Sequence, residues 1–212
     1  VLTKTDLLPP EKVDEIVRVF RDYVMRFGDF PAKRYLAVFA EQTSDREYIH
    51  SSAHSVGFAG PVNVDDTFIA HEIFHVWNDG IINQKSQYEG WFKEGFTQYY
   101  GYLTPYRVGL YNKEQFLQHL KKDYEEYLKR YGTEDDIALT RVKEELARKE
   151  GQYQPESARL WAMYYKGALV ASLMDNEIKK RTGGLRTLDD LMYYMFHKFR
   201  EERYSSEDVM EA

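Results

Sequence analysis

The chain has 212 residues, of which 43% are hydrophobic and 30% charged, a composition typical of a globular protein. Its net charge is −6 and no basic stripe is present, which argues against nucleic acid as a partner. It contains no cysteine, which excludes disulfides, thiolate catalysis and cysteine-ligated zinc, and no apolar run approaches membrane-spanning length.

The first part of the chain predicts a helix, a strand region and a second helix. Two prolines open a helix over residues 10–27, which carries apolar side chains at helical spacing. Residues 35–39 predict a short apolar strand, and residues 48–58 a second strand with mixed facing. An acidic cap at residues 65–66 begins the next helix, which we expect to end at residues 78–80.

The remainder of the chain predicts helices. They cover residues 91–103, 113–131, 134–149, 158–182 and 187–202, with Thr187 and the acids after it as the cap of the last one. The final residues, from Ser205 on, look like another helix start. Because the chain begins without Met and stops in this pattern, we expect it to be a fragment of a longer protein. The predicted fold class is α+β, mostly α.

The most specific motif is His71-Glu72-Ile73-Phe74-His75. Helix residues four apart share a face, so His71 and His75 can present two imidazoles to one metal ion. Glu72 beside them is placed to take a proton from a water on that metal. The pentapeptide alone also fits an amphipathic helix whose two histidines are ordinary polar neighbours.

A second motif, Trp91-Phe92-Lys93-Glu94-Gly95-Phe96, argues against that plain interpretation. Glu94 follows His75 by nineteen positions, far enough for the chain to turn and return a carboxylate on a second helix. Two His and one Glu with an open fourth position form the ligand set of a catalytic zinc site. Gly95, directly after the carboxylate, allows another backbone or a substrate to approach closely. We therefore predict His71, His75 and Glu94 as ligands of Zn²⁺, with Glu72 as the general base.

Peptide hydrolysis at such a site also needs a donor for the oxyanion of the tetrahedral intermediate. Tyr164 and Tyr165 are the candidates, and the alternative is that both belong to the packing surface of their helix. His50 and His54, four apart on the predicted strand 48–58, are expected on one face of it. They could contact substrate or a second ion, or simply face solvent.

These motifs resemble those of the gluzincin metallopeptidases, most closely the glycyl aminopeptidase family, whose members often carry a PDZ domain. Residues 71–78 are similar to that family's zinc helix and residues 91–100 to its third-ligand helix. Residues 164–171 are similar to the segment that carries its catalytic tyrosine, and residues 182–190 to a later helix start. The resemblance implies a thermolysin-like catalytic domain, with a small sheet beside the zinc helix and a helical lobe behind it.

By this resemblance the oxyanion donor is Tyr164, with Tyr165 in reserve, and the substrate is a peptide or protein. We expect one catalytic unit with two subdomains. Residues 1–110 would form a subdomain with the zinc helix and small sheet, and residues 111–212 a helical subdomain. The family's N-terminal β-rich domain and its PDZ domain are not within these 212 residues.

Two departures from the family pattern leave the exact activity open. Aminopeptidases of this clan carry a glutamate upstream of the zinc helix that binds the substrate's free amine, but residues 48–60 contain no acid. An endopeptidase therefore remains an alternative, as do a non-catalytic zinc-bearing peptide-binding or scaffold module and a zinc hydrolase with a non-peptide substrate. The family also tends to have an acid near Gly101, so support for the ligands is expected from Asp65, Asp66 or Asn78.

Overall fold

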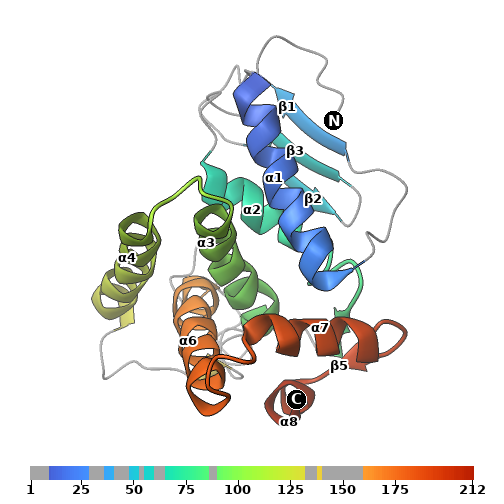
Figure 1. Ribbon diagram of the computed structural model, residues 1–212, viewed down its shortest axis with the longest axis vertical. Helices are drawn as coiled ribbons and strands as arrows, with labels where there is room; N and C mark the ends of the chain where they lie inside the picture. Colours follow the sequence, from blue (N-terminus) through green and yellow to red (C-terminus); the bar gives the residue numbers. More distant parts are fainter. Residues whose placement is uncertain are drawn as a thin grey trace, which may run out of the picture.

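The computed structural model describes residues 10–28, 36–40, 48–52, 55–59, 65–85, 90–131, 138–139 and 160–212. Figure 1 shows α1 (Pro10–Phe27) and the strands β1, β2 and β3 at one end of the molecule, with α6, α7 and α8 toward the other. Helices dominate, which confirms the predicted α+β, mostly α class. In the part of the chain described here, no helix is both long enough and apolar enough to cross a membrane.

The main sheet has three strands in the order β1-β3-β2, and it differs from the predicted one. β1 (Leu36–Ala40) runs parallel to β3 (Ser55–Ala59), which pairs antiparallel with β2 (Tyr48–Ser52). The predicted single strand 48–58 is therefore wrong, because this stretch is a hairpin. Its turn sequence lacks Gly, Asn and Pro, so no signal marked the reversal. His50 lies on β2 and His54 outside the described residues, and since β2 ends at Ser52 the two do not share one strand.

The helix predicted from residues 65–66 is α2 (Asp66–Phe74), whose N-cap Asp65 accepts a hydrogen bond from the Thr67 amide. Six of its nine residues are buried, as expected of a helix that is apolar on most faces. Regular helix ends at Phe74 rather than at residues 78–80, and turns follow. His75 nevertheless keeps helical backbone angles as the C-cap, so it stays in step with the helix.

Helices make up most of what the structure describes after α2. The predicted helix 91–103 begins as the π-helix η2 (Trp91–Phe96) and continues as α3 (Thr97–Arg107). The others that the structure describes are α4 (Lys113–Tyr131), α6 (Leu160–Arg181), α7 (Leu188–Lys198) and α8 (Ser206–Glu211). Capping boxes at Thr187 and Ser205 confirm the last two predicted helix starts. Most of the predicted helix 134–149 lies outside the described residues.

A second small sheet pairs β4 (Asn83–Gln84) with β5 (Arg203–Tyr204) in parallel. The sequence predicted neither strand, because two residues are too few to show an alternating pattern. The pairing joins the loop between α2 and η2 to the chain that follows α7. It therefore ties the region between α2 and η2 to the C-terminal helices.

The core lies where α2 packs between α1 and α3. Its centre is aromatic: the Phe74 ring stacks on Tyr100 at 4.3 Å between centroids and contacts Tyr23 at 5.2 Å. The Tyr23 hydroxyl donates to the carbonyl oxygens of Ala70 (3.0 Å) and Tyr100 (3.2 Å). Ala70 directly precedes His71, so this buried tyrosine holds the backbone of the zinc-motif helix between its two neighbours.

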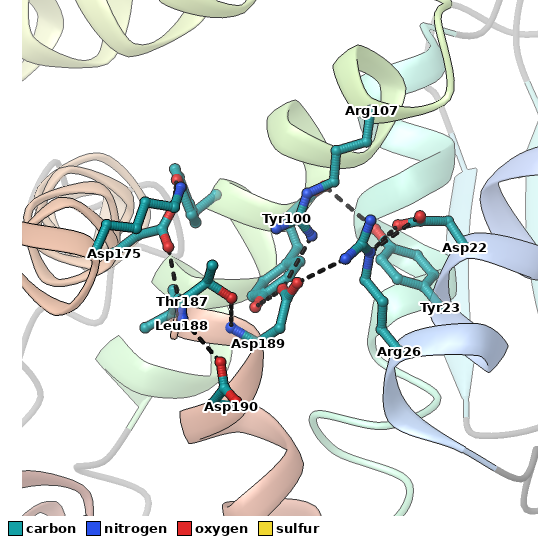
Figure 2. Close-up of polar contacts among 12 residues, drawn as sticks. Asp22, Tyr23, Arg26, Tyr100, Arg107, Asp175, Thr187, Leu188, Asp189 and Asp190 are labelled. Carbon is teal, nitrogen blue, oxygen red and sulfur yellow. Dashed lines mark hydrogen bonds and ion pairs between the residues drawn. The ribbon is translucent and has the colours of Figure 1, made fainter. Parts of the chain in front are cut away.

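A charged network surrounds this core at the junction of α1, α3 and α7 (Figure 2). Asp189 accepts hydrogen bonds from Tyr100 (2.7 Å), Arg107 (2.9 Å) and Arg26 (2.9 Å). Arg26 also pairs with buried Asp22 at 2.9 Å. The carboxylates and guanidiniums thus compensate one another, and three helices distant in sequence share one hydrogen-bonded junction.

Candidate metal centre

The structure brings the two histidines of the first motif together. The Nε2 atoms of His71 and His75 lie 3.1 Å apart, and both side chains are buried. The His75 amide donates to the His71 carbonyl at 3.3 Å, so the four-residue spacing survives although regular helix ends at Phe74. Both rings therefore point their Nε2 atoms at one place, as the helical spacing predicted.

Glu94 joins them from η2. Its Oε2 lies 3.4 Å from Nε2 of His75 and 3.7 Å from Nε2 of His71. Glu94 stands within a π-helical turn, an irregularity that occurs frequently at functional sites. Among the described residues, these three form the one group of His, Asp and Glu whose ligand atoms converge within 4.8 Å.

The three groups fit a zinc ion. Ligand atoms bound to a tetrahedral Zn²⁺ at about 2.0–2.1 Å are about 3.3 Å apart, which is close to the three separations observed. Two neutral imidazoles and one carboxylate are also the donor types that catalytic zinc prefers. The Nδ1 atoms of both histidines are buried and find no hydrogen-bond partner among the described residues. The Nε2 atoms are therefore the ones presented for coordination.

Electrostatics favour a charged carboxylate at this position. Burial of Glu94 acts to raise its pKa, but hydrogen bonds and charge from His71 and His75 outweigh burial and hold the pKa well below its usual range. Glu94 is therefore ionised at neutral pH, which is the state that binds a cation.

Glu72 and Tyr164 lie at the same site. Glu72 is 7% exposed on α2, next to His71. The Tyr164 ring, from α6, stacks against the His71 ring with centroids 6.0 Å apart. Burial raises the pKa of Tyr164, and the charge of Glu94, a hydrogen bond to Glu94 and the charge of Glu72 raise it further. The structure thus gathers the predicted base and the predicted oxyanion donor around the three predicted ligands.

Tyr165 faces another region. It lies near Tyr102, whose hydroxyl shares its hydrogen between the two carboxylate oxygens of Asp123, each 3.0 Å away. Tyr102 and Asp123 belong to α3 and α4. Of the two candidate tyrosines, the geometry therefore favours Tyr164 as the one that can reach the metal centre.

Two glycines allow η2 and α6 to meet. A Cβ atom on Gly95 would lie 2.4 Å from the Gly167 Cα, and one on Gly167 would lie 2.7 Å from the Gly95 Cα. The backbones themselves are thus in contact, and this contact sets Glu94 beside Tyr164. The prediction that Gly95 admits another backbone agrees with this geometry. Gly167 was not predicted, although a glycine inside an apolar helix often marks a close approach.

The expected supports for the ligands lie in different places. Asp65 caps α2 and accepts a hydrogen bond from Tyr111 at 2.6 Å, and Asp66 pairs with Lys12. These interactions do not reach His71 or His75. Asn78 instead donates to the carbonyls of Phe92 and Lys93, immediately before Glu94.

Gly101 packs directly on the zinc-motif helix. A Cβ there would lie 2.9 Å from the Thr67 carbonyl oxygen and 3.2 Å from the His71 Cβ. The position at which the resembled family tends to carry an acid is therefore filled by backbone contact between α3 and α2. A larger side chain would have to displace α2.

Comparison with solved structures establishes the fold. An aminopeptidase N family protein from Idiomarina loihiensis superimposes with a TM-score of 0.78 at 16% identity, over 100% of this chain and 40% of its own. An M1 zinc metallopeptidase from Deinococcus radiodurans gives 0.67 at 16% identity, over 100% of this chain and 42% of its own. A mutant of that enzyme bound to a Tyr-Ser-Ala substrate gives 0.65 at 15% identity. The chain thus spans about two fifths of the length of these structures.

No curated protein matches the chain significantly, but a protein-family model matches the part of the chain that forms the site. Residues 66–170 match the model of the M61 glycyl aminopeptidases, a range that contains both histidines, Glu72, Glu94 and Tyr164. Since the match begins at the zinc-motif helix and ends within α6, it covers the whole described metal centre. The segment that forms the metal centre is therefore similar to the M61 glycyl aminopeptidases, over 105 of the 212 residues.

Proposed function

We propose that this chain is the catalytic part of a zinc-dependent peptidase, and that it acts as an aminopeptidase. The observation that supports this most directly is the convergence of His71, His75 and Glu94 with Glu72 and Tyr164 beside them. A structural zinc site would use a fourth protein ligand, whereas three ligands next to a base and a phenol suit catalysis. The match of residues 66–170 to the M61 glycyl aminopeptidase model supports the same activity.

In this proposal, Glu72 and Tyr164 make the proton transfer and the hydrogen bond that peptide hydrolysis needs. Zinc held by the three ligands would lower the pKa of a bound water to about 7 and polarise the scissile carbonyl. Glu72 accepts the proton of the attacking water and delivers it to the leaving amine, which is worth about 10²–10⁴-fold. Because its pKa is raised, Tyr164 keeps its proton at neutral pH and can donate to the developing oxyanion.

We also infer that the catalytic unit has a thermolysin-like arrangement, in which two subdomains both contribute residues to the site. The ligands and Glu72 come from residues 1–110, with the small sheet, whereas Tyr164 comes from the helical residues 111–212. The site would then lie at the boundary between the two, where η2 packs on α6. Substrate side-chain preference would be set by the loops around this boundary.

Endopeptidase activity is the second candidate, because residues 48–60 contain no acid to bind a free amine. A carboxylate that faces the substrate's ammonium is what makes binding of a free N-terminus selective. The two activities differ in their response to blocked substrates: an endopeptidase should cut N-acetylated peptides well, and an aminopeptidase should not.

The test is mass spectrometry of a mixed peptide library, half of it N-acetylated, incubated with zinc-loaded protein and with its Glu72→Gln variant. We expect single residues to be released from free N-termini, and the variant to bind zinc but to be about 10²–10⁴-fold slower. Cleavage that persists in the variant would disprove the role of Glu72. Bound zinc without any cleavage would instead favour a peptide-binding or scaffold module.

A further inference from the structure

Asn78 forms a buried contact between the two ligand-bearing segments. It is 1% exposed and lies three residues after His75, in the turn that follows α2. Its Nδ2 donates to the Lys93 carbonyl (3.1 Å), the Phe92 carbonyl (3.2 Å) and the Thr97 hydroxyl (3.2 Å). These acceptors flank Glu94 on both sides in sequence. One amide therefore contacts the chain both before and after Glu94, in η2 and at the first residue of α3.

The orientation of this amide follows from its neighbours. Two of the three are carbonyl oxygens, which only accept hydrogen bonds, so the nitrogen and not the oxygen must face them. The Asn78 Oδ1 is buried and has no hydrogen-bond partner among the described residues. Among the described residues, the side chain is thus held through its Nδ2 donor, which contacts η2 and the first residue of α3.

The location of these bonds matters because η2 is π-helical. The change from π to α spacing around Glu94 interrupts the regular backbone hydrogen bonding, and such interruptions need donors from elsewhere. An exposed ion pair between Lys93 and Asp79 (2.8 Å) also bridges the two segments. Asp79 is 44% exposed, so solvent competes with this pair, whereas Asn78 is shielded from solvent.

We propose that Asn78 is a positioning residue: it holds η2 so that the Glu94 carboxylate meets the Nε2 atoms of His71 and His75, and it thereby sets the affinity of the site for zinc. The inference rests on the proposed zinc site. Partners of metal ligands typically change metal affinity by about 10–100-fold when they are mutated.

The experiment measures the zinc dissociation constant of metal-free full-length protein by competition with a chromophoric chelator, together with the melting temperature without metal. Asn78→Ala removes the side-chain Nδ2 donor, and Asn78→Asp removes the same donor while keeping the shape of the side chain. We expect both to bind zinc about 10–100-fold more weakly than the wild type. The negative charge added in Asn78→Asp would by itself favour binding of a cation. Weaker zinc binding by this variant would therefore be due to the changed position of Glu94 and not to charge.

Two control variants separate position from stability. Asp79→Asn removes the exposed ion pair between Asp79 and Lys93. Tyr99→Phe, in α3, removes a buried hydrogen bond to Asp175 of α6 (2.7 Å) and leaves His71, His75 and Glu94 untouched. We expect Tyr99→Phe to lower the melting temperature of the metal-free protein, and both controls to keep the wild-type zinc constant. The absorption bands of bound Co²⁺ should change in the Asn78 variants alone, because they report the ligand geometry.

The outcomes are distinct. A folded Asn78 variant with the wild-type zinc constant and Co²⁺ spectrum would overturn this inference and leave the proposed peptidase intact. A zinc constant that weakens in Tyr99→Phe as much as in the Asn78 variants would also overturn it, because the effect would then follow stability alone. If the wild type fails to bind zinc stoichiometrically, the proposed function itself is wrong.

Discussion

Tyr164 and Tyr165 are neighbours in the chain with different surroundings. The Tyr164 ring stacks against His71, and the charges of Glu94 and Glu72 raise the pKa of its hydroxyl. Tyr165 instead lies near the buried Tyr102 of α3. Adjacent residues on a helix point about 100° apart, so only one of the two can face a given site. Residue type could not decide between them, because both are tyrosines on the same helix.

We expect Tyr164→Phe to lower kcat about 10²–10³-fold, the usual effect of removing one oxyanion donor. KM and zinc content should change little, because the ring and its stacking on His71 remain. Steady-state kinetics on a peptide substrate checks this. The matched variant is Tyr165→Phe, which removes the same atom one residue away. Equal losses of kcat in both variants would contradict the assignment.

At the scale of elements, the contact between η2 and α6 couples two parts of the site. Glu94 precedes Gly95, and Tyr164 lies one turn before Gly167 on α6. The two glycines allow the backbones to touch, so the carboxylate and the phenol come within hydrogen-bonding reach. Any atom inserted between the glycines would separate Glu94 from Tyr164.

We expect Gly167→Ala to destabilise the fold by about 1–3 kcal/mol through overpacking. The new Cβ would lie 2.7 Å from the Gly95 Cα and 3.0 Å from the Trp91 carbonyl oxygen, both backbone atoms. Because η2 and α6 must then separate, kcat should fall together with stability. Urea denaturation and steady-state kinetics of the same preparation measure both effects.

The control for this variant is Gly184→Ala, just after α6. Its φ of 84° strains any larger residue, but no atom lies within 4 Å of the added Cβ. It should lose stability and keep kcat. If Gly167→Ala also kept kcat, the contact would position neither catalytic group.

At the scale of the whole molecule, the stability of the fold depends on a buried acid outside the group of His71, His75 and Glu94. Asp123 of α4 is 3% exposed, and the hydroxyl of Tyr102 in α3 shares its hydrogen between the two carboxylate oxygens. Burial raises its pKa to about 7, although the bond from Tyr102 and the charge of Lys122 act in the opposite direction. Folding therefore favours the protonated form of this carboxyl.

The sign of the pH effect follows from this raised pKa. Between pH 4 and pH 7 the folded chain holds a proton on Asp123 that the unfolded chain has released. The stability that this group contributes is present below about pH 4 and is lost as the pH rises through 7. Asp123→Asn stays neutral throughout and should avoid the loss. We expect its free energy of unfolding, relative to the wild type, to increase by roughly 2–4 kcal/mol from pH 4 to pH 8.

Urea denaturation of both proteins at several pH values measures this difference. Glu94 and Asp175, whose pKa values are lowered, are present in both proteins, so their contributions cancel in the comparison. A difference that does not depend on pH would show that Asp123 is ionised in the folded protein across the whole range.

Much of the fold was predictable because its signals are local. The helix over residues 10–27 and the start of the next at Asp65 follow from proline, cap residues and apolar spacing over neighbouring positions. The hairpin of β2 and β3 and the pairing of β4 with β5 were missed. Both depend on hydrogen bonds between segments, and no turn residue or alternating pattern marks them in the chain.

The same division holds for the metal centre. The sequence by itself determined the chemistry: the two imidazoles at helical spacing, the carboxylate between them and the second carboxylate nineteen residues on are properties of short segments. Only the tertiary structure decided that Glu94 stands in a π-helical turn, that this turn touches Gly167, and that the Tyr164 ring, which the family resemblance already favoured over Tyr165, stacks against His71. The last two features bring together residues more than seventy positions apart, and such contacts depend on how whole elements pack, which no local pattern in the chain encodes.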